Sequence, residues 1–170
     1  MKIRRFTGLS VNMLISLVLV LFGHAMTPRL GTSSGNGNPA IMLLIPLIIL
    51  FLVMVYQWIR LFQDVRISVG RLSLFVTALV GYIIAGYVYQ LHRLEIYREI
   101  QADAFESKFG YVDWSHIESI TSGILSIHMN NQFFNWNTYF MMLAFSLLLC
   151  FLYRLIQALM NKKRATPGKY

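Results

Sequence analysis

The sequence has little charge, and this shortage points to a membrane. Only 13% of its 170 residues are charged, about half the share of a soluble domain, whereas 56% are hydrophobic. The charge is missing from four long apolar runs, and these runs leave no stretch for a second globular unit. We therefore expect one membrane domain that covers residues 1–170.

Cysteine is almost absent as well. The one cysteine, Cys150, lies inside an apolar run, so the chain cannot form an internal disulfide, a CxxC redox pair or a cysteine-based zinc site. This excludes the four-helix thiol oxidoreductases. Acidic residues are missing from the interiors of the apolar runs. Cation-coupled transporters usually keep an ionisable group in the membrane, so exporters that depend on an embedded glutamate are also excluded.

Each apolar run has the length of a transmembrane helix. A helix rises about 1.5 Å per residue, so about 20 apolar residues cross the hydrocarbon core. The predicted spans are residues 9–26, 40–59, 72–91 and 138–160. None of them alternates with a period of two, which argues against a membrane β-barrel. We predict an all-α integral membrane protein, a bundle of four transmembrane helices with a short helical cap between spans three and four.

The first span has a second interpretation, as a signal peptide. Lys2, Arg4 and Arg5 precede the apolar stretch, and Gly23 and Ala25 have the small side chains of a cleavage site. The run is longer than the usual apolar core of about 7–15 residues. We therefore expect a transmembrane helix that is retained.

Basic residues predict the orientation. With a cytoplasmic N-terminus, eleven Lys and Arg residues, Lys169 among them, lie inside, and only Arg29, Arg93, Arg98 and Lys108 lie outside. The positive-inside rule then places both termini in the cytoplasm. We expect a plasma membrane, specifically a bacterial inner membrane, because the chain is compact and has no N-glycosylation sequon. The net charge of +8 is mainly a topology signal, so we expect the lipid bilayer and no nucleic acid as a partner.

The first outer loop, residues 27–39, is rich in small polar residues. Its stretch 31–38 contains Gly, Thr, Ser and Asn only, which is typical of a flexible, solvated linker. It lacks the lysine and the helix start that a phosphate-binding P-loop requires. We expect a connection without chemistry of its own.

The second outer segment, residues 92–137, carries six of the seven acids and three of the four histidines. Its first part has neither Gly nor Pro before Gly110, which predicts that the third helix continues beyond the membrane. Ser115 and Glu118 fit a capping box. Isoleucines then recur at helical spacing, which predicts a surface helix over about residues 116–129.

Histidines and acids are the candidates for a cofactor or metal site. His24 and His92 end spans one and three at similar depth, and two such imidazoles can clamp a haem. Asp113, His116 and Glu118 form the densest ligand-like cluster. Interfacial histidines more often bond to water or headgroups, and the capping box already explains Glu118. We therefore expect no cofactor.

Small residues mark span three as a packing surface. Ala78, Gly81, Ala85 and Gly86 lie along it, and Gly81 with Ala85 forms a small-xxx-small pair that permits close helix contact. The partner helix could belong to this chain or to another. In span two, Pro46 is a candidate kink.

The motifs that are missing favour a non-catalytic role. With no nucleophile, nucleotide or embedded-charge motif, we predict an accessory, assembly or regulatory subunit of a membrane complex, with a membrane protein or a second copy as its partner. The first alternative is a small oligomeric transporter or channel whose path follows spans two and three. The second is an outer-face membrane protein that binds metal or haem.

Overall fold

The computed structural model describes residues 2–32 and 37–164, and these residues form helices without any strand. Lys169 and loop residues 33–36 lie outside the described residues. The elements are α1 (Lys2–Ala25), the 3-10 helix η1 (Pro39–Leu43), α2 (Leu44–Phe62), α3 (Val69–Phe109), α4 (Trp114–Ile120), the 3-10 helix η2 (Ile127–Met129), α5 (Asn130–Phe133) and α6 (Trp136–Arg164). Four of them, α1, α2, α3 and α6, are long and apolar enough to cross a membrane.

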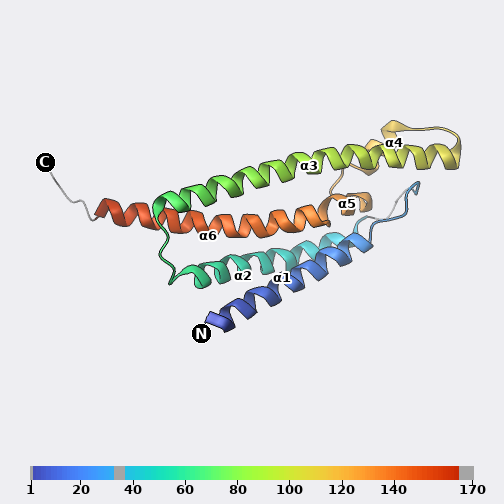
Figure 1. Cartoon of the computed structure of the whole chain (residues 1–170). Helices are drawn as coiled ribbons and strands as arrows, with labels where there is room; N and C mark the ends of the chain where they lie inside the picture. Colours follow the sequence, from blue (N-terminus) through green and yellow to red (C-terminus); the bar gives the residue numbers. More distant parts are fainter. Residues whose placement is uncertain (1, 33–36, 165–170) are drawn as a thin grey trace.

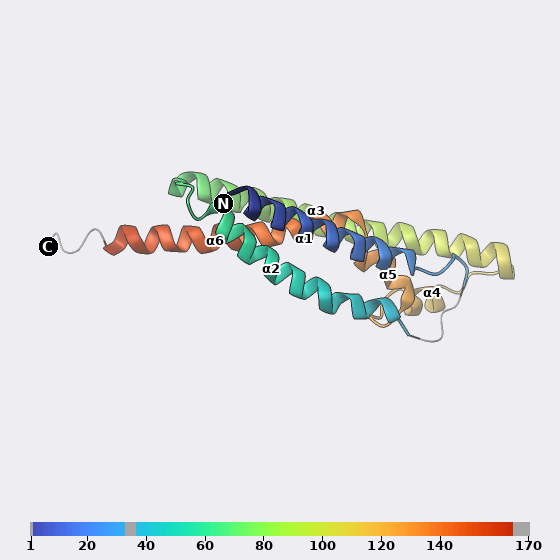
Figure 2. The ribbon, with the colours of Figure 1, turned by 90° about the horizontal axis from the view of Figure 1, so that it is seen from below.

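The helix α6 lies at the centre of the molecule. It packs along α3 on one side and against α2 on the other, while α1 packs mainly against α2. The start of α1 and the end of α6 lie toward one end of the molecule, and α4 and α5 lie at the opposite end (Figure 1). Seen from below, α2 runs obliquely to α6 and α3 (Figure 2). The four long helices therefore leave one side of α6 open between α2 and α3.

Two small apolar clusters hold the long helices together. One joins α1, α2 and α6 around Val20, Leu47 and Tyr139. A second, around Leu72 and Phe151, joins α3 to α6 near the start of α3. The rest of the helix surface is largely exposed and apolar. Such a surface is suited to a hydrocarbon solvent, in which an outward-facing leucine costs nothing.

The third helix continues past the predicted span, as the sequence predicts. It has 41 residues, about twice the length that crosses a hydrocarbon core. It ends at Gly110, whose φ of 78° is left-handed and whose N–H donates to the carbonyl of Glu106. The outer half of α3 is a platform for the cap. Ala102 and Phe105 of α3 pack there against Ile117 and Ile120 of α4.

The predicted surface helix is too long. The helix α4 ends at Ile120, and the chain then turns before the short η2. The hydroxyl of Thr121 donates to the carbonyl of Ile117 at 2.7 Å, and Ser126 N–H donates to Gly123 across a turn. Side-chain hydroxyls that bond to the local backbone compete with helix continuation, and glycine adds flexibility. The isoleucine spacing therefore overstates the helix, and Ile124 is exposed.

The predicted capping box is also wrong. Asp113 is the N-cap of α4, and its carboxylate accepts from the backbone N–H of His116 at 3.1 Å. Ser115 does not cap the helix, because its hydroxyl donates to the same carboxylate at 2.9 Å. These two donors lower the pKa of Asp113 below its usual value.

Candidate functional site

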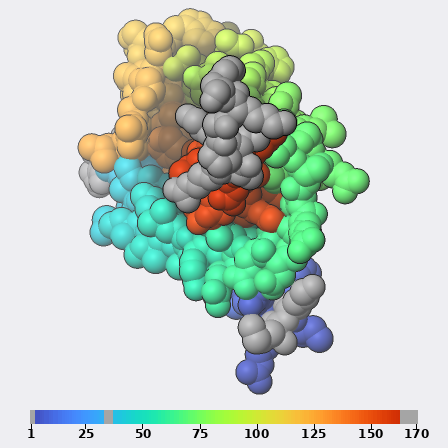
Figure 3. Space-filling view, turned by 90° about the vertical axis from the view of Figure 1, so that its left-hand side faces the viewer, coloured from blue at the N-terminus to red at the C-terminus, as the bar shows by residue number. Residues whose placement is uncertain are grey.

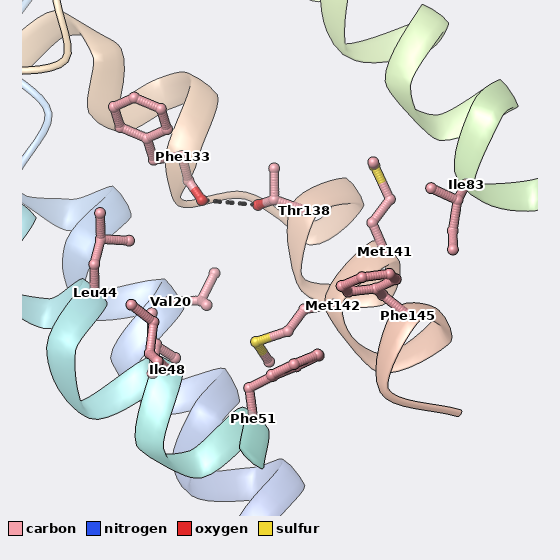
Figure 4. A pocket seen from close by; sticks show the side chains of 11 residues that line it. Val20, Leu44, Ile48, Phe51, Ile83, Phe133, Thr138, Met141, Met142 and Phe145 are labelled. Atoms are coloured by element: carbon pink, nitrogen blue, oxygen red, sulfur yellow. Dashed lines mark hydrogen bonds between the residues drawn. The ribbon is translucent and has the colours of Figure 1, made fainter. Parts of the chain in front are cut away.

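An apolar groove of about 580 Å³ could receive another molecule. Leu44, Ile48 and Phe51 of α2 line one side, and Ile83 of α3 lies across from them. Met142 and Phe145 of α6 form the floor, together with other apolar side chains (Figure 4). The groove is the open space between α2 and α3 over α6.

The groove offers almost no polar group to a ligand. Thr138 is its one hydroxyl-bearing residue, and that hydroxyl donates to the carbonyl of Phe133 at 2.9 Å, within the protein (Figure 4). The rings of Phe51 and Phe145 stack with centroids 5.6 Å apart. Such a surface can bind an acyl chain or the apolar side chains of another helix.

The small residues of α3 divide between two faces. Gly86 is buried, and a Cβ at this position would lie 2.8 Å from the sulfur of Met141 in α6. Its carbonyl accepts from Asn137 Nδ2 at 2.9 Å. Around Gly81 nothing lies within 4 Å of an added Cβ, and Ala78 and Ala85 are exposed too. The structure therefore uses Gly86 for packing inside the chain and leaves the other three residues facing outward.

A buried histidine organises the outer cap. His128 is fully buried, and its Nε2 lies 2.8 Å from the carbonyl oxygen of Thr32. Since a carbonyl only accepts, Nε2 carries the proton and Nδ1 is the acceptor. The hydroxyl of Tyr97 and the amide nitrogen of Gln101 each lie 3.0 Å from Nδ1. Burial lowers the pKa of His128 from its usual value, which favours this neutral form.

The same network anchors the first outer loop. Gln101 accepts from the backbone N–H of Gly31 at 2.9 Å, and Lys108 donates to the carbonyl of Gly31 at 3.2 Å. At the far end of the loop, Asn38 caps η1 and donates to Asn130 at 2.7 Å. Gly31 and Asn38 are buried. The interpretation of both loop ends as solvated linker is therefore wrong.

The two histidines of the predicted haem pair lie on different helices. His24 lies in the last turn of α1 and His92 in α3, and both are exposed. The helix α5 contacts both α1 and α3 and lies between them in Figure 1. His92 Nδ1 lies 3.9 Å from a carboxylate oxygen of Glu95. Each imidazole thus has its own surroundings on the surface.

One residue of the predicted metal cluster, Asp113, has a structural role. Asp113 is occupied as the N-cap described above, and His116 places its ring edge-on to Phe105, with centroids 5.5 Å apart. Glu118 is exposed. Within residues 2–32 and 37–164, no group of three His, Cys, Asp or Glu side chains has the arrangement of a metal site.

The predicted kink residue lies at the start of its helix. Pro46 is the third residue of α2, directly after η1. Proline is accommodated in a first turn because amides there have no partner within the helix.

Amide side chains tie the spans together at both ends, and of these the sequence pointed to Asn12 as a helix–helix hydrogen-bonding residue but not to Gln90. Gln90 of α3 bonds to Gln132, Asn135 and Asn137 where α5 passes into α6. Toward the other end, Asn12 of α1 donates to Gln57 of α2 at 2.9 Å. The position of such residues in the sequence indicates this role. An amide side chain inside or beside an apolar run needs a hydrogen-bond partner, since an unpaired amide is costly in lipid.

The chain matches no protein-family model, and no curated protein and no solved structure resembles it at a significant level.

Proposed function

We propose that this protein is a non-catalytic subunit of a membrane complex, which binds a transmembrane helix of a partner protein in the groove between α2 and α3. The groove carries the proposal. Its volume of about 580 Å³ is lined by side chains from all four long helices, and its one hydroxyl is satisfied internally. An apolar side-chain row on another helix is the complement of such a surface.

The burial of α3 agrees with this proposal. Only 11% of its most apolar stretch is buried within the chain, against 28% in α1 and in α6. At about 100° per residue, the exposed residues Ala78, Gly81 and Ala85 lie on the face of α3 turned away from Ile83, so they do not border the groove. A helix docked in the groove would contact α3 at Ile83 and add to the small buried share of this span.

The proposed setting is a plasma membrane with both termini in the cytoplasm, and a bacterial inner membrane suits the compact chain. The support is the distribution of basic residues in the sequence. The described ends of α1 and α6 also lie toward one end of the molecule, away from the cap (Figure 1).

A pair of photo-crosslinking positions tests the docked helix. A benzophenone amino acid replaces Ile83, which lines the groove, or Val18, which is exposed on α1 away from it. In native membranes, we expect Ile83 to form one protein adduct of defined mass and Val18 to form lipid adducts only. In parallel, Ile83→Trp should fill the groove and release that same protein from the purified complex, whereas Val18→Trp should retain it.

Two outcomes would overturn the subunit proposal. Crosslinking of Ile83 to a second copy of the chain would favour the oligomeric transporter, which flux measurements in proteoliposomes would then examine. Lipid adducts alone at both positions, with no protein released by Ile83→Trp, would show that the groove holds an acyl chain.

A further inference from the structure

A second, polar pocket lies between α1 and α2 at the end of the molecule opposite the cap. It has a volume of about 280 Å³ and is lined by Arg4, Arg5, Gly8, Tyr56, Gln57 and Arg60. Figure 3 looks onto this end of the molecule, where the first residues of α1, in blue, border the surface contributed by the α2–α3 region. The pocket is distinct from the apolar groove and shares no residue with it.

One arginine of this pocket is part of the fold. Arg5 Nη1 donates to the carbonyl of Arg60 at 2.9 Å and to the carboxylate of Asp64 at 3.1 Å. Its side chain is only 14% exposed. Arg5 therefore joins the start of α1 to the end of α2, and Asp64 neutralises its charge.

The other two arginines keep their charge available. Arg4 and Arg60 are exposed, and Asp64 is the one carboxylate of the described residues that forms an ion pair with an arginine here. Arg60 holds its guanidinium 5.9 Å above the ring of Tyr56, a contact that leaves its N–H edges free to donate. The pocket thus has two guanidinium groups in excess of its local negative charge.

The floor of the pocket is fixed by polar contacts. Gln57 Nε2 donates to the carbonyl of Gly8 at 3.2 Å, and Gln57 Oε1 accepts from the buried Asn12 at 2.9 Å. Nothing but Gln57 lies within 4 Å of a Cβ at Gly8. Gly8 thus keeps the space between the two helices open, at the depth where the apolar part of α1 begins.

We propose that this pocket binds the phosphate of an anionic phospholipid headgroup, with Arg4 and Arg60 as its donors. Arginine donates two parallel hydrogen bonds to a phosphate, and basic pockets between transmembrane helices are suited to lipid headgroups. The pocket lies at the polar end of two apolar helices, where the bilayer itself presents phosphates while the acyl chains lie along the exposed surface of α1 and α2.

Native mass spectrometry of the delipidated full chain tests this site. The probes are phosphatidylglycerol, phosphatidylcholine and inorganic phosphate. We expect one phosphatidylglycerol to bind per chain, more tightly than phosphatidylcholine, and the affinity to fall with added salt. Arg4→Gln combined with Arg60→Gln should weaken phosphatidylglycerol binding about thirtyfold.

The matched control removes the same charge from the same end of the chain. Arg66 and Arg71 are exposed and line no part of the pocket, so Arg66→Gln with Arg71→Gln should leave the affinity within about twofold. If the double variant misfolds, Arg4→Gln alone can be tested. We expect it to fold, because no hydrogen bond of the described residues involves the Arg4 side chain. It should weaken binding by about fivefold.

Three results would overturn the proposal. An equal loss in the control variant would show a general attraction between positive charge and anionic lipid. Phosphatidylcholine binding as tight as phosphatidylglycerol binding would show that the acyl chains dominate. Inorganic phosphate that binds as tightly as the lipid, and is lost with Arg4 and Arg60, would assign the pocket to free phosphate. The groove crosslinks proposed above do not depend on any of these results.

Discussion

His128 Nδ1 lies 3.0 Å from the hydroxyl of Tyr97, and this contact joins the cap to the outer half of the longest helix. The two residues are 31 positions apart, and both are buried. The other ring nitrogen of His128 reaches the first outer loop at Thr32. One imidazole therefore connects three segments that the sequence separates widely.

Replacing His128 with alanine should loosen the whole cap. The change leaves the carbonyl of Thr32 without its donor and removes the acceptor used by Tyr97, so we expect a loss of about 1–3 kcal/mol in the free energy of unfolding. Thermal unfolding in detergent measures this loss, and hydrogen exchange at the Gly31 amide should accelerate with it. His92→Ala, at an exposed site, is the control and should change stability by no more than about 0.5 kcal/mol. Equal effects of both changes would contradict a structural role for His128.

The cap should also loosen in acid because of His128. Burial is the main cause of its lowered pKa, and the positive charge of a protonated His116 acts in the same direction, while the Thr32 carbonyl opposes both. A histidine whose folded pKa is depressed adds stability above its unfolded pKa of about 6.5. That stability is lost as the pH falls from 6.5 through the folded pKa, because the unfolded state binds the proton more readily.

Hydrogen exchange at pH 7.5 and pH 5 gives the measurement. We expect the Gly31 amide to lose protection at the lower pH in the wild type. The His128→Gln variant should show no such additional loss, since its side chain does not titrate. An equal pH response in both proteins would assign the effect to a group other than His128.

How far the sequence predicts this fold depends on the range of the interactions. The spans follow from runs of apolar residues, and the continuation of α3 follows from a stretch without a helix breaker, so both could be found locally. The burial of His128 could not be predicted locally, because it depends on contacts with Thr32 and Tyr97, which are distant in the sequence. Nor does the sequence decide between Asp113 and Ser115 as the cap of α4, since both are good caps two positions apart.

That choice of cap can be tested by substitution. Asp113→Ala should increase hydrogen exchange at the His116 amide, whose N–H loses its acceptor, and should weaken α4. Glu118→Ala should leave exchange at the Ser115 amide unchanged, although in a capping box the Glu118 carboxylate would accept from that N–H. The pKa of Asp113 is lowered by its donors, so its contribution should be present near neutral pH and disappear as acid protonates the carboxylate. Faster exchange at the Ser115 amide in Glu118→Ala would restore the capping box.

The buried ring of Phe134 explains why α1 has glycine at position 23. A Cβ at Gly23 would lie 2.5 Å from two atoms of that ring, and Phe134 is fully buried and has little room to move. Gly23→Ala should therefore lower the free energy of unfolding by about 1–3 kcal/mol. Gly81→Ala is the control, because nothing lies within 4 Å of its added methyl. It should be neutral or stabilising, since alanine favours a helix by up to about 1 kcal/mol.

A second substitution separates the clash from a general effect on α1. Phe134→Leu removes the ring, so the combination with Gly23→Ala should cost less than the sum of the two single changes. Thermal unfolding of all four variants in one detergent gives both comparisons. If the losses at positions 23 and 134 simply add, the two residues are not in contact. The packing of α1 against the segment between α5 and α6 would then differ from the one described.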